Sequence, residues 1–186
     1  IESGGTLNTV VGDESGTSIT TGDENSLFGF VSGDAITTGI RNVAVGSYAL
    51  STNVAGDQSV AVGHGALFAQ NPSGNVDMNN VAVGHDAGNQ ITTGVENTIV
   101  GGIAGDALTV GDFNTAVGKG ALTNDTKGGN STALGYNALQ TQNFTSATDT
   151  GNVAVGHFAG TGLTTGLKNS LVGALTGDAL TDADFN

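Results

Sequence analysis

The sequence contains no cysteine and no tryptophan, and it has one proline and one methionine among 186 residues. Without cysteine, neither a disulfide framework nor a thiolate metal site can form, so stability must come from hydrogen bonds, packing or association. Large side chains are scarce, because the chain has seven phenylalanines and two tyrosines. Alanine and valine supply most of the apolar surface. These small side chains suit a thin interior, only a few side chains wide.

Basic residues are also rare, with four lysines and arginines against 17 aspartates and glutamates, for a net charge of −13. A nucleic-acid surface needs clustered lysine and arginine, so we expect no nucleic-acid partner. The acidity favours solubility, with cation binding as the alternative. No apolar run reaches the length of a membrane span, so we also expect no direct membrane insertion.

A motif of the form Asn-x-x-x-Gly recurs along the chain with a stride of 17 residues. Two steps are 21 residues long, from Ser59 to Asn80 and from Ser131 to Asn152, so a larger unit of 72 residues begins at positions 8, 80 and 152. A fixed period of this kind predicts a stack of equivalent coils rather than a globule with one central core. We therefore expect a single repeat domain over residues 1–186. Because the chain opens at Ile1 without methionine and Asn186 begins a new repeat, we expect it to be a segment of a longer fibre.

One repeat, residues 80–96, reads NVAVGHDAGNQITTGVE and consists of short β-branched segments divided by glycines. This pattern predicts two or three short strands joined by tight turns, and it shows no helical period. The fold class that follows is all-β, a parallel β-solenoid of about ten coils. At the strand spacing of about 4.8 Å per coil, the body is roughly 50 Å long.

The positions two and three residues after each motif asparagine are apolar in every repeat, although neighbouring side chains of a strand face opposite ways. We interpret the third position as the coil interior and the second as a face that another copy of the chain covers. On this interpretation the chain forms a homo-oligomer, a trimer about a threefold axis. The alternative places the second position inside a wider monomeric coil. The proposed oligomer face consists of Ala44, Ala61, Ala82, Ala116, Ala133 and Ala154.

The asparagines and glycines of the motif are interpreted as structural. A glycine that recurs at one position indicates positive φ or a lack of room for Cβ, and this applies to Gly46, Gly84, Gly118 and Gly156. Asparagine tolerates the left-handed region, and its amide can bond to the coils on either side. We expect such a turn and ladder role for Asn8, Asn25, Asn42, Asn80, Asn97, Asn114, Asn152 and Asn169.

The four extra residues of each unit fall within residues 69–79 and 141–151. Repeat proteins carry insertions on one face, so we expect these segments to bulge outward as loops. Loops on a regular scaffold are the first place to look for specific contacts. The candidate contact residues are Asn71, Pro72, Asn75, Gln142, Asn143 and Phe144.

Residues with catalytic or metal-binding chemistry are few. His64 and His85 fall on adjacent coils, where imidazoles can bind a transition metal, but the residue types at that repeat position vary as on a solvent-facing surface, so we predict no metal site. Asp34, Asp106 and Asp178 recur every 72 residues and fit turn chemistry. The sequence has no nucleophile elbow and no phosphate loop, and a regular rod offers no cleft for paired carboxylates. We therefore expect neither a cofactor nor enzyme activity.

Residues 42–50 (NVAVGSYAL) and 114–122 (NTAVGKGAL) resemble the head repeats of trimeric autotransporter adhesins and the repeats of bacteriophage tail-fibre proteins. The resemblance extends over nearly the whole chain, although the stride of 17 residues is longer than the usual adhesin repeat. It implies a left-handed parallel β-roll that trimerises within an elongated fibre, on a virion or on a cell surface.

Three functions are therefore open. The first is a structural fibre segment, the shaft or head of a phage tail fibre or a similar fibre, which supports attachment to a host surface glycan or protein. The alternative is a bacterial trimeric surface adhesin. An ice-binding solenoid is the third, because Thr20, Thr37 and Thr92 share a repeat position, but Val54 and Asn71 interrupt that row.

Overall fold

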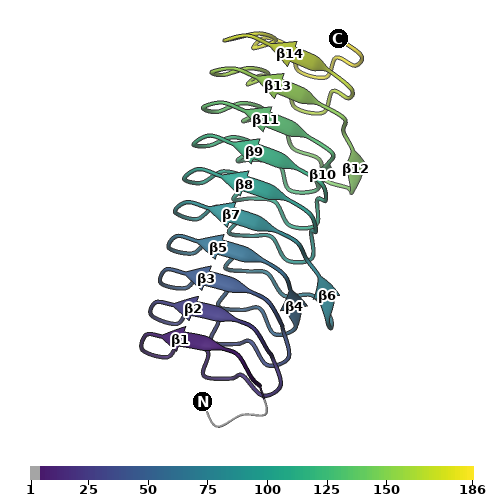
Figure 1. Ribbon diagram of the computed structural model, residues 1–186. Coiled ribbons are helices and arrows are strands. Elements are labelled where there is room, and N and C mark those ends of the chain that lie inside the picture. The colour runs from purple at the N-terminus through teal and green to yellow at the C-terminus, as the bar shows by residue number, and fades with distance from the viewer. Residues whose placement is uncertain (1–4) are drawn as a thin grey trace.

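The computed structural model describes residues 5–186, which form one parallel β-solenoid (Figure 1). Residues 1–4 of the predicted repeat domain lie outside the described part. Ten short strands stack in chain order into a single parallel sheet, one strand per coil, and residues 5–186 contain no helix. The predicted all-β solenoid of about ten coils is confirmed.

Each strand of this main sheet is only three residues long, and turns and bends make up most of the rest of residues 5–186. The strands are β1 (Thr9–Val11), β2 (Ser26–Phe28), β3 (Val43–Val45), β5 (Val60–Val62), β7 (Val81–Val83), β8 (Thr98–Val100), β9 (Thr115–Val117), β11 (Thr132–Leu134), β13 (Val153–Val155) and β14 (Ser170–Val172).

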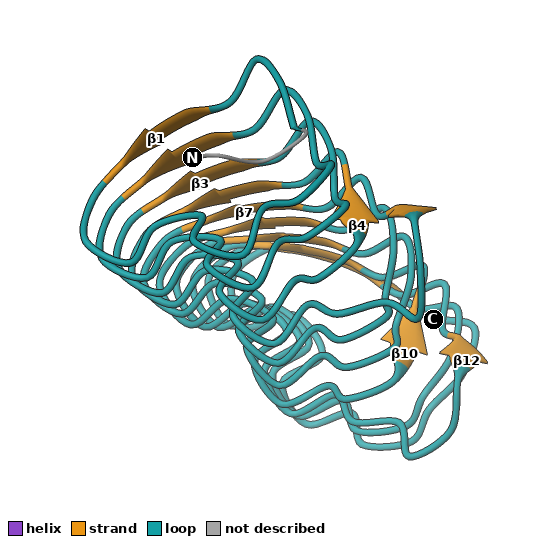
Figure 2. Ribbon diagram, turned by 90° about the horizontal axis from the view of Figure 1, so that it is seen from below, coloured by secondary structure: helices purple, strands orange, loops and turns teal. Residues whose placement is uncertain are grey.

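The extra residues of the 21-residue steps leave the main sheet undisturbed. Across the first of these steps, Val60 pairs with Val81 and Ala61 with Ala82, as in a 17-residue step. The added residues form small two-stranded sheets, in which β4 (Gly56–Asp57) pairs with β6 (Val76–Asp77), and β10 (Gly128–Gly129) pairs with β12 (Thr148–Asp149). Figures 1 and 2 show these pairs on a flank away from the main sheet. The insertions are therefore accommodated at one side of the rod.

The turn after each strand requires glycine for two reasons, as Gly84 illustrates. Its φ of +141° is rarely adopted by other residues, and an added Cβ would lie 2.6 Å from the carbonyl carbon and oxygen of Gly101 in the next coil. Successive coils therefore pass too closely at this corner for any side chain.

The core is a narrow column of small and branched apolar side chains. The middle residue of each strand points inward and packs with leucines and isoleucines from the turns, among them Leu67 and Ile91, which are fully buried. The predicted assignment of the two strand faces is therefore wrong, and the alternative of an interior alanine column holds. The residues expected at the oligomer face are all 0% exposed: Ala44, Ala61, Ala82, Ala116, Ala133 and Ala154.

The physical reason for the reversal is the size of the residues opposite the strand. Because leucine and isoleucine also enter the interior from the turns, alanine is enough at the middle of six strands. In three other strands the middle residue is itself large and buried: Leu27, Ile99 and Leu171. The valines expected inside point outward instead, with Val45 38% and Val83 37% exposed.

Candidate assembly surface

The outer sheet face consists of the first and third residues of the ten strands of the main sheet. These twenty side chains are valine, threonine, serine, leucine or phenylalanine, and none carries a charge. The third residues form the more apolar row: Val11, Phe28, Val45, Val62, Val83, Val100, Val117, Leu134, Val155 and Val172.

This face is an uncharged strip on a strongly acidic molecule. All twenty residues are half-buried or exposed, and the third residues are most open at the two ends of the sheet. Charged residues occur beside the strip, immediately before the repeat asparagines, where the Nε of Arg41 lies 2.8 Å from Oε2 of Glu24. An uncharged strip that contains a continuous apolar row and has charged residues at its edge is typical of a site of association.

A buried amide ladder holds the strands in register. In Asn97, Nδ2 donates to the carbonyl oxygen of Gly111 at 2.9 Å, and Oδ1 accepts from the backbone nitrogen of Asn114 at 2.9 Å. Equivalent bonds from Nδ2 to a carbonyl 14 residues later are made by Asn8, Asn25, Asn42, Asn80, Asn114, Asn152 and Asn169. These side chains stabilise the rod and are not available to a ligand.

Two glutamines maintain this network where serine replaces the repeat asparagine. Gln70 Oε1 accepts from Asn80 Nδ2 at 3.0 Å and from Ser59 Oγ at 3.2 Å. One unit later, Gln142 Oε1 accepts from Asn152 Nδ2 at 2.8 Å. Both glutamines are fully buried, and the structural role of Gln70 was missed in the sequence. The signal was present, because the two glutamines stand 72 residues apart in the insertions that follow the two serines.

The candidate contact loops are consequently only half exposed. Asn71, Asn75 and Asn143 are exposed, whereas Pro72, Gln142 and Phe144 are buried and the prediction that they make outward contacts is wrong. The exposed asparagines also bond to earlier coils. Asn75 Oδ1 accepts from Thr38 Oγ1, two coils earlier, at 3.0 Å, and Asn143 Oδ1 accepts from Thr126 Oγ1 in the preceding coil at 2.9 Å. The insertions therefore act first as structural braces.

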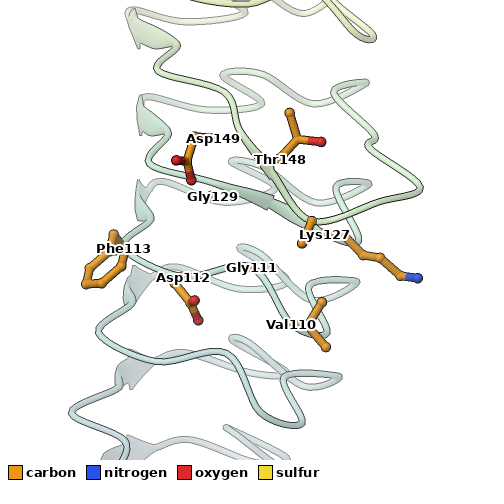
Figure 3. Close-up of a pocket in the computed structure, with 9 residues that line it drawn as sticks. Val110, Gly111, Asp112, Phe113, Lys127, Gly129, Thr148 and Asp149 are labelled. Carbon is orange, nitrogen blue, oxygen red and sulfur yellow. The ribbon is translucent and has the colours of Figure 1, made fainter.

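A hollow of about 220 Å³ lies beside β10 and β12 (Figure 3). Its two carboxylates are engaged in the fold, because Asp112 Oδ1 accepts from the backbone nitrogen of Val95 at 2.8 Å and Asp149 Oδ1 accepts from Asn130 Nδ2 at 2.9 Å. Figure 3 shows Lys127 extended away from both carboxylates. The lining contains neither histidine nor serine, and its one side-chain hydroxyl belongs to Thr148.

The pKa values of three aspartates are shifted by their surroundings. Burial raises the pKa of Asp34, Asp57 and Asp106, in each case more than the hydrogen bonds to the carboxylate lower it. Asp57 Oδ1 accepts from the backbone nitrogen of Ile40 at 2.7 Å, and Asp106 accepts from Thr123. Oδ1 of Asp34 is buried without a hydrogen-bond partner.

No known protein family, curated protein or solved structure matches the chain. Within residues 5–186, no helix is long and apolar enough to cross a bilayer.

Proposed function

We propose that this chain is a structural segment of a fibre and that three copies associate through their outer sheet faces. The fibre would be the shaft or head of a phage tail fibre or of a similar trimeric fibre, carried on a virion or a cell surface, and it would support attachment to a host cell. The observation that carries this proposal is the uncharged face, which runs over all ten strands of the main sheet in a molecule with a net charge of −13.

A second copy of the same chain is the partner that matches this face best. The exposed residues repeat once per coil, at about the 4.8 Å spacing of parallel strands. Another copy in parallel orientation presents the same period, so contacts made at one coil recur at every coil. The absence of charge on the face also lets copies approach without opposing their carboxylates.

A threefold arrangement uses both rows of the face. Around such an axis each copy contacts two neighbours, so the row of first residues of one copy meets the row of third residues of the next. This closed heterologous contact leaves no unpaired apolar face, and it agrees with the trimeric fibres that the repeats resemble.

The test is the mass of the chain in solution, measured by size-exclusion chromatography with light scattering. We expect a trimer for the native chain and a folded monomer for the double variant Val62→Glu/Val83→Glu, because each of the three contacts would then bury two carboxylates against an uncharged row. Val54→Glu is the matched control, since Val54 is also 37% exposed but lies outside the main sheet. A native monomer, or a double variant that stays trimeric, would refute the proposed interface.

A bacterial trimeric surface adhesin is the second candidate, and it would use the same assembly. It is favoured by two exposed aromatic rings on neighbouring coils, Phe30 and Tyr48, whose centroids lie 5.5 Å apart. Exposed aromatic residues are enriched at recognition sites. Binding of the trimer to an array of host glycans, abolished by Tyr48→Ala, would favour the adhesin, and the absence of binding would favour the shaft.

The ice-binding alternative loses support from the threonine hydroxyls. Thr20 Oγ1 donates to the carbonyl oxygen of Thr37 at 3.0 Å, and Thr92 Oγ1 donates to that of Thr109 at 3.1 Å. These hydroxyls bond along the rod to the next coil instead of donating to ordered water.

A further inference from the structure

Two histidines from neighbouring coils stack face to face at the junction between the first and second 72-residue units. His64 and His85 each follow the glycine that ends a strand, and their ring centroids lie 5.2 Å apart with an angle of 11° between the ring planes. They are 21 residues apart in the chain, but the main sheet keeps its register across that step and so brings the two rings together.

The carboxylate of Asp86 lies against both rings. Its Oδ2 is 3.2 Å from Nδ1 of His85, and its Oδ1 is 3.6 Å from Nδ1 of His64. One donor atom from each of the three side chains falls within 4.8 Å of the other two. The two imidazoles are more than half exposed, so an ion can reach these atoms from solvent.

A fourth residue holds the carboxylate in place. Asn89 Nδ2 donates to Asp86 Oδ1 at 3.3 Å and to the carbonyl oxygen of Gly65 at 3.0 Å. Outer residues of this kind orient the ligands of metal sites. Tyr48 and Phe68 line the same depression, which has a volume of about 290 Å³.

We propose that His64, His85 and Asp86 bind one divalent transition-metal ion, with Zn²⁺ the best match. Two neutral imidazoles and one carboxylate are a donor set that suits Zn²⁺, and a fourth position stays open to water. Bonds of about 2.1 Å in tetrahedral geometry place donor atoms about 3.4 Å apart, so small side-chain rotations complete the site. All three ligands come from one chain, and the inference does not rest on the proposed trimer.

The equivalent position one unit later shows that the fold itself does not require these residues. Seventy-two residues beyond His64, His85 and Asp86 stand Tyr136, His157 and Phe158. Their rings pack on one another, with centroids 5.5 Å apart for Tyr136 and His157 and 4.4 Å apart for His157 and Phe158. The same scaffold position is thus an aromatic cluster in one unit and a set of metal donors in the other.

The position of the site suggests what the ion does. It joins the coils on either side of a 21-residue step, where Ser59 interrupts the row of ladder asparagines. An ion that binds the folded chain but not the unfolded chain stabilises the fold, by an amount that grows with the ratio of the free ion concentration to the dissociation constant. The metal would therefore stabilise the contact between the two coils at the boundary between units.

Isothermal titration of the untagged, chelator-treated chain with ZnCl₂ tests the proposal. We expect one ion per chain, an affinity at least about tenfold weaker in His64→Ala, His85→Ala and Asp86→Asn, and a higher unfolding temperature in the presence of Zn²⁺. His157→Ala is the matched control and should bind like the native chain. Equal losses in His157→Ala, or binding that none of the three variants weakens, would overturn the assignment.

A gain-of-site variant provides an independent test. The double substitution Tyr136→His/Phe158→Asp recreates the three donors beside His157, and circular dichroism checks that the chain stays folded. We expect the stoichiometry to rise from one ion to two. If the folded variant still binds a single ion, three donors at this position of adjacent coils do not make a metal site, which would contradict the geometric basis of the proposal.

Discussion

At the scale of single residues, the tight coil depends on backbone conformations that most side chains avoid. The sixth residue after the motif asparagine has positive φ throughout, and glycine or asparagine fills this position at Gly65, Gly120 and Asn137. Val31 occupies the same position with a φ of 56°. A β-branched residue in the left-handed region is strained, because its side chain crowds the backbone.

Replacing Val31 should therefore stabilise the chain. We expect Val31→Asn to raise the free energy of unfolding by about 1 kcal/mol, because asparagine tolerates the left-handed region and a β-branched residue is strained in it. Urea denaturation followed by circular dichroism measures the change. Val54→Asn is the control, because Val54 also lies between strands but has no positive φ. A less stable Val31→Asn variant would contradict the strain argument.

Removing a rung of the amide ladder should have the opposite effect. Asn97→Ala leaves the backbone nitrogen of Asn114 and the carbonyl oxygen of Gly111 without their partners in the buried interior. We expect a loss of about 2–6 kcal/mol in the free energy of unfolding, since each of the two buried unpaired groups costs about 1–3 kcal/mol. The same urea titration applies, with the exposed Asn124→Ala as control. Equal stability of the two variants would mean that water replaces the ladder.

At the scale of the strand, both faces are apolar but only one is inside. Ala82 points into the core and is 0% exposed, while its neighbour Val83 is 37% exposed. The two positions therefore separate folding from association, although they are adjacent in the chain.

We expect Ala82→Glu to unfold the coils around β7 rather than to dissociate a folded chain. The cost should exceed about 3 kcal/mol, because the variant combines an oversized side chain with a buried charge. Val83→Glu should have the circular dichroism spectrum of the native chain. Its urea midpoint should equal that of the native chain when both are measured as monomers. A folded Ala82→Glu chain would place the alanine row outside the core.

The repeat period was enough to predict the coils, but it could not tell the two strand faces apart. Both rows are apolar in every repeat, so the alternation of side chains along the strand does not show which row faces the core. The missing information was the volume of the other side chains in the interior. Leu67 and Ile91 enter it from turns whose path the sequence does not reveal. The insertions were misjudged for a related reason, since the buried Gln142 replaces a ladder amide that Ser131 lacks.

The histidine cluster was harder to predict than the ladder. Variation among the residues after the turn glycine correctly indicated a solvent-facing position. What it could not show is that the positive φ of Asp86, 52°, accompanies a carboxylate placed against both imidazoles. That contact depends on the turn geometry rather than on the repeat.

At the scale of the whole molecule, the acidic charge and the partly buried aspartates both lower the free energy of unfolding as the pH rises. Because burial raises the pKa of Asp34, Asp57 and Asp106 above the ordinary value of 3.8, the folded chain binds their protons more tightly than the unfolded chain does. The resulting stabilisation is full below about pH 3.8 and is lost as the pH rises through the raised pKa values.

We therefore expect the free energy of unfolding to be higher at about pH 4.5 than at pH 7, as fewer carboxylates are charged. Asp34→Asn should stabilise the chain at pH 7 and reduce this difference, because its carboxylate oxygen is buried without a partner. Urea titrations at a series of pH values provide the measurement, with the exposed Asp13→Asn as the charge-matched control. Lower stability at pH 4.5 would contradict this account.

The four residues added at each long step do not change the register of the main sheet, so the rod holds its insertions at a fixed spacing. The two excursions, at β6 and β12, emerge from the same flank four coils apart, about 19 Å at the strand spacing. Peptides grafted there would be displayed at a set pitch without altering the scaffold between them. An array of this kind can match the spacing of receptors on a surface, so that avidity is governed by the number of units.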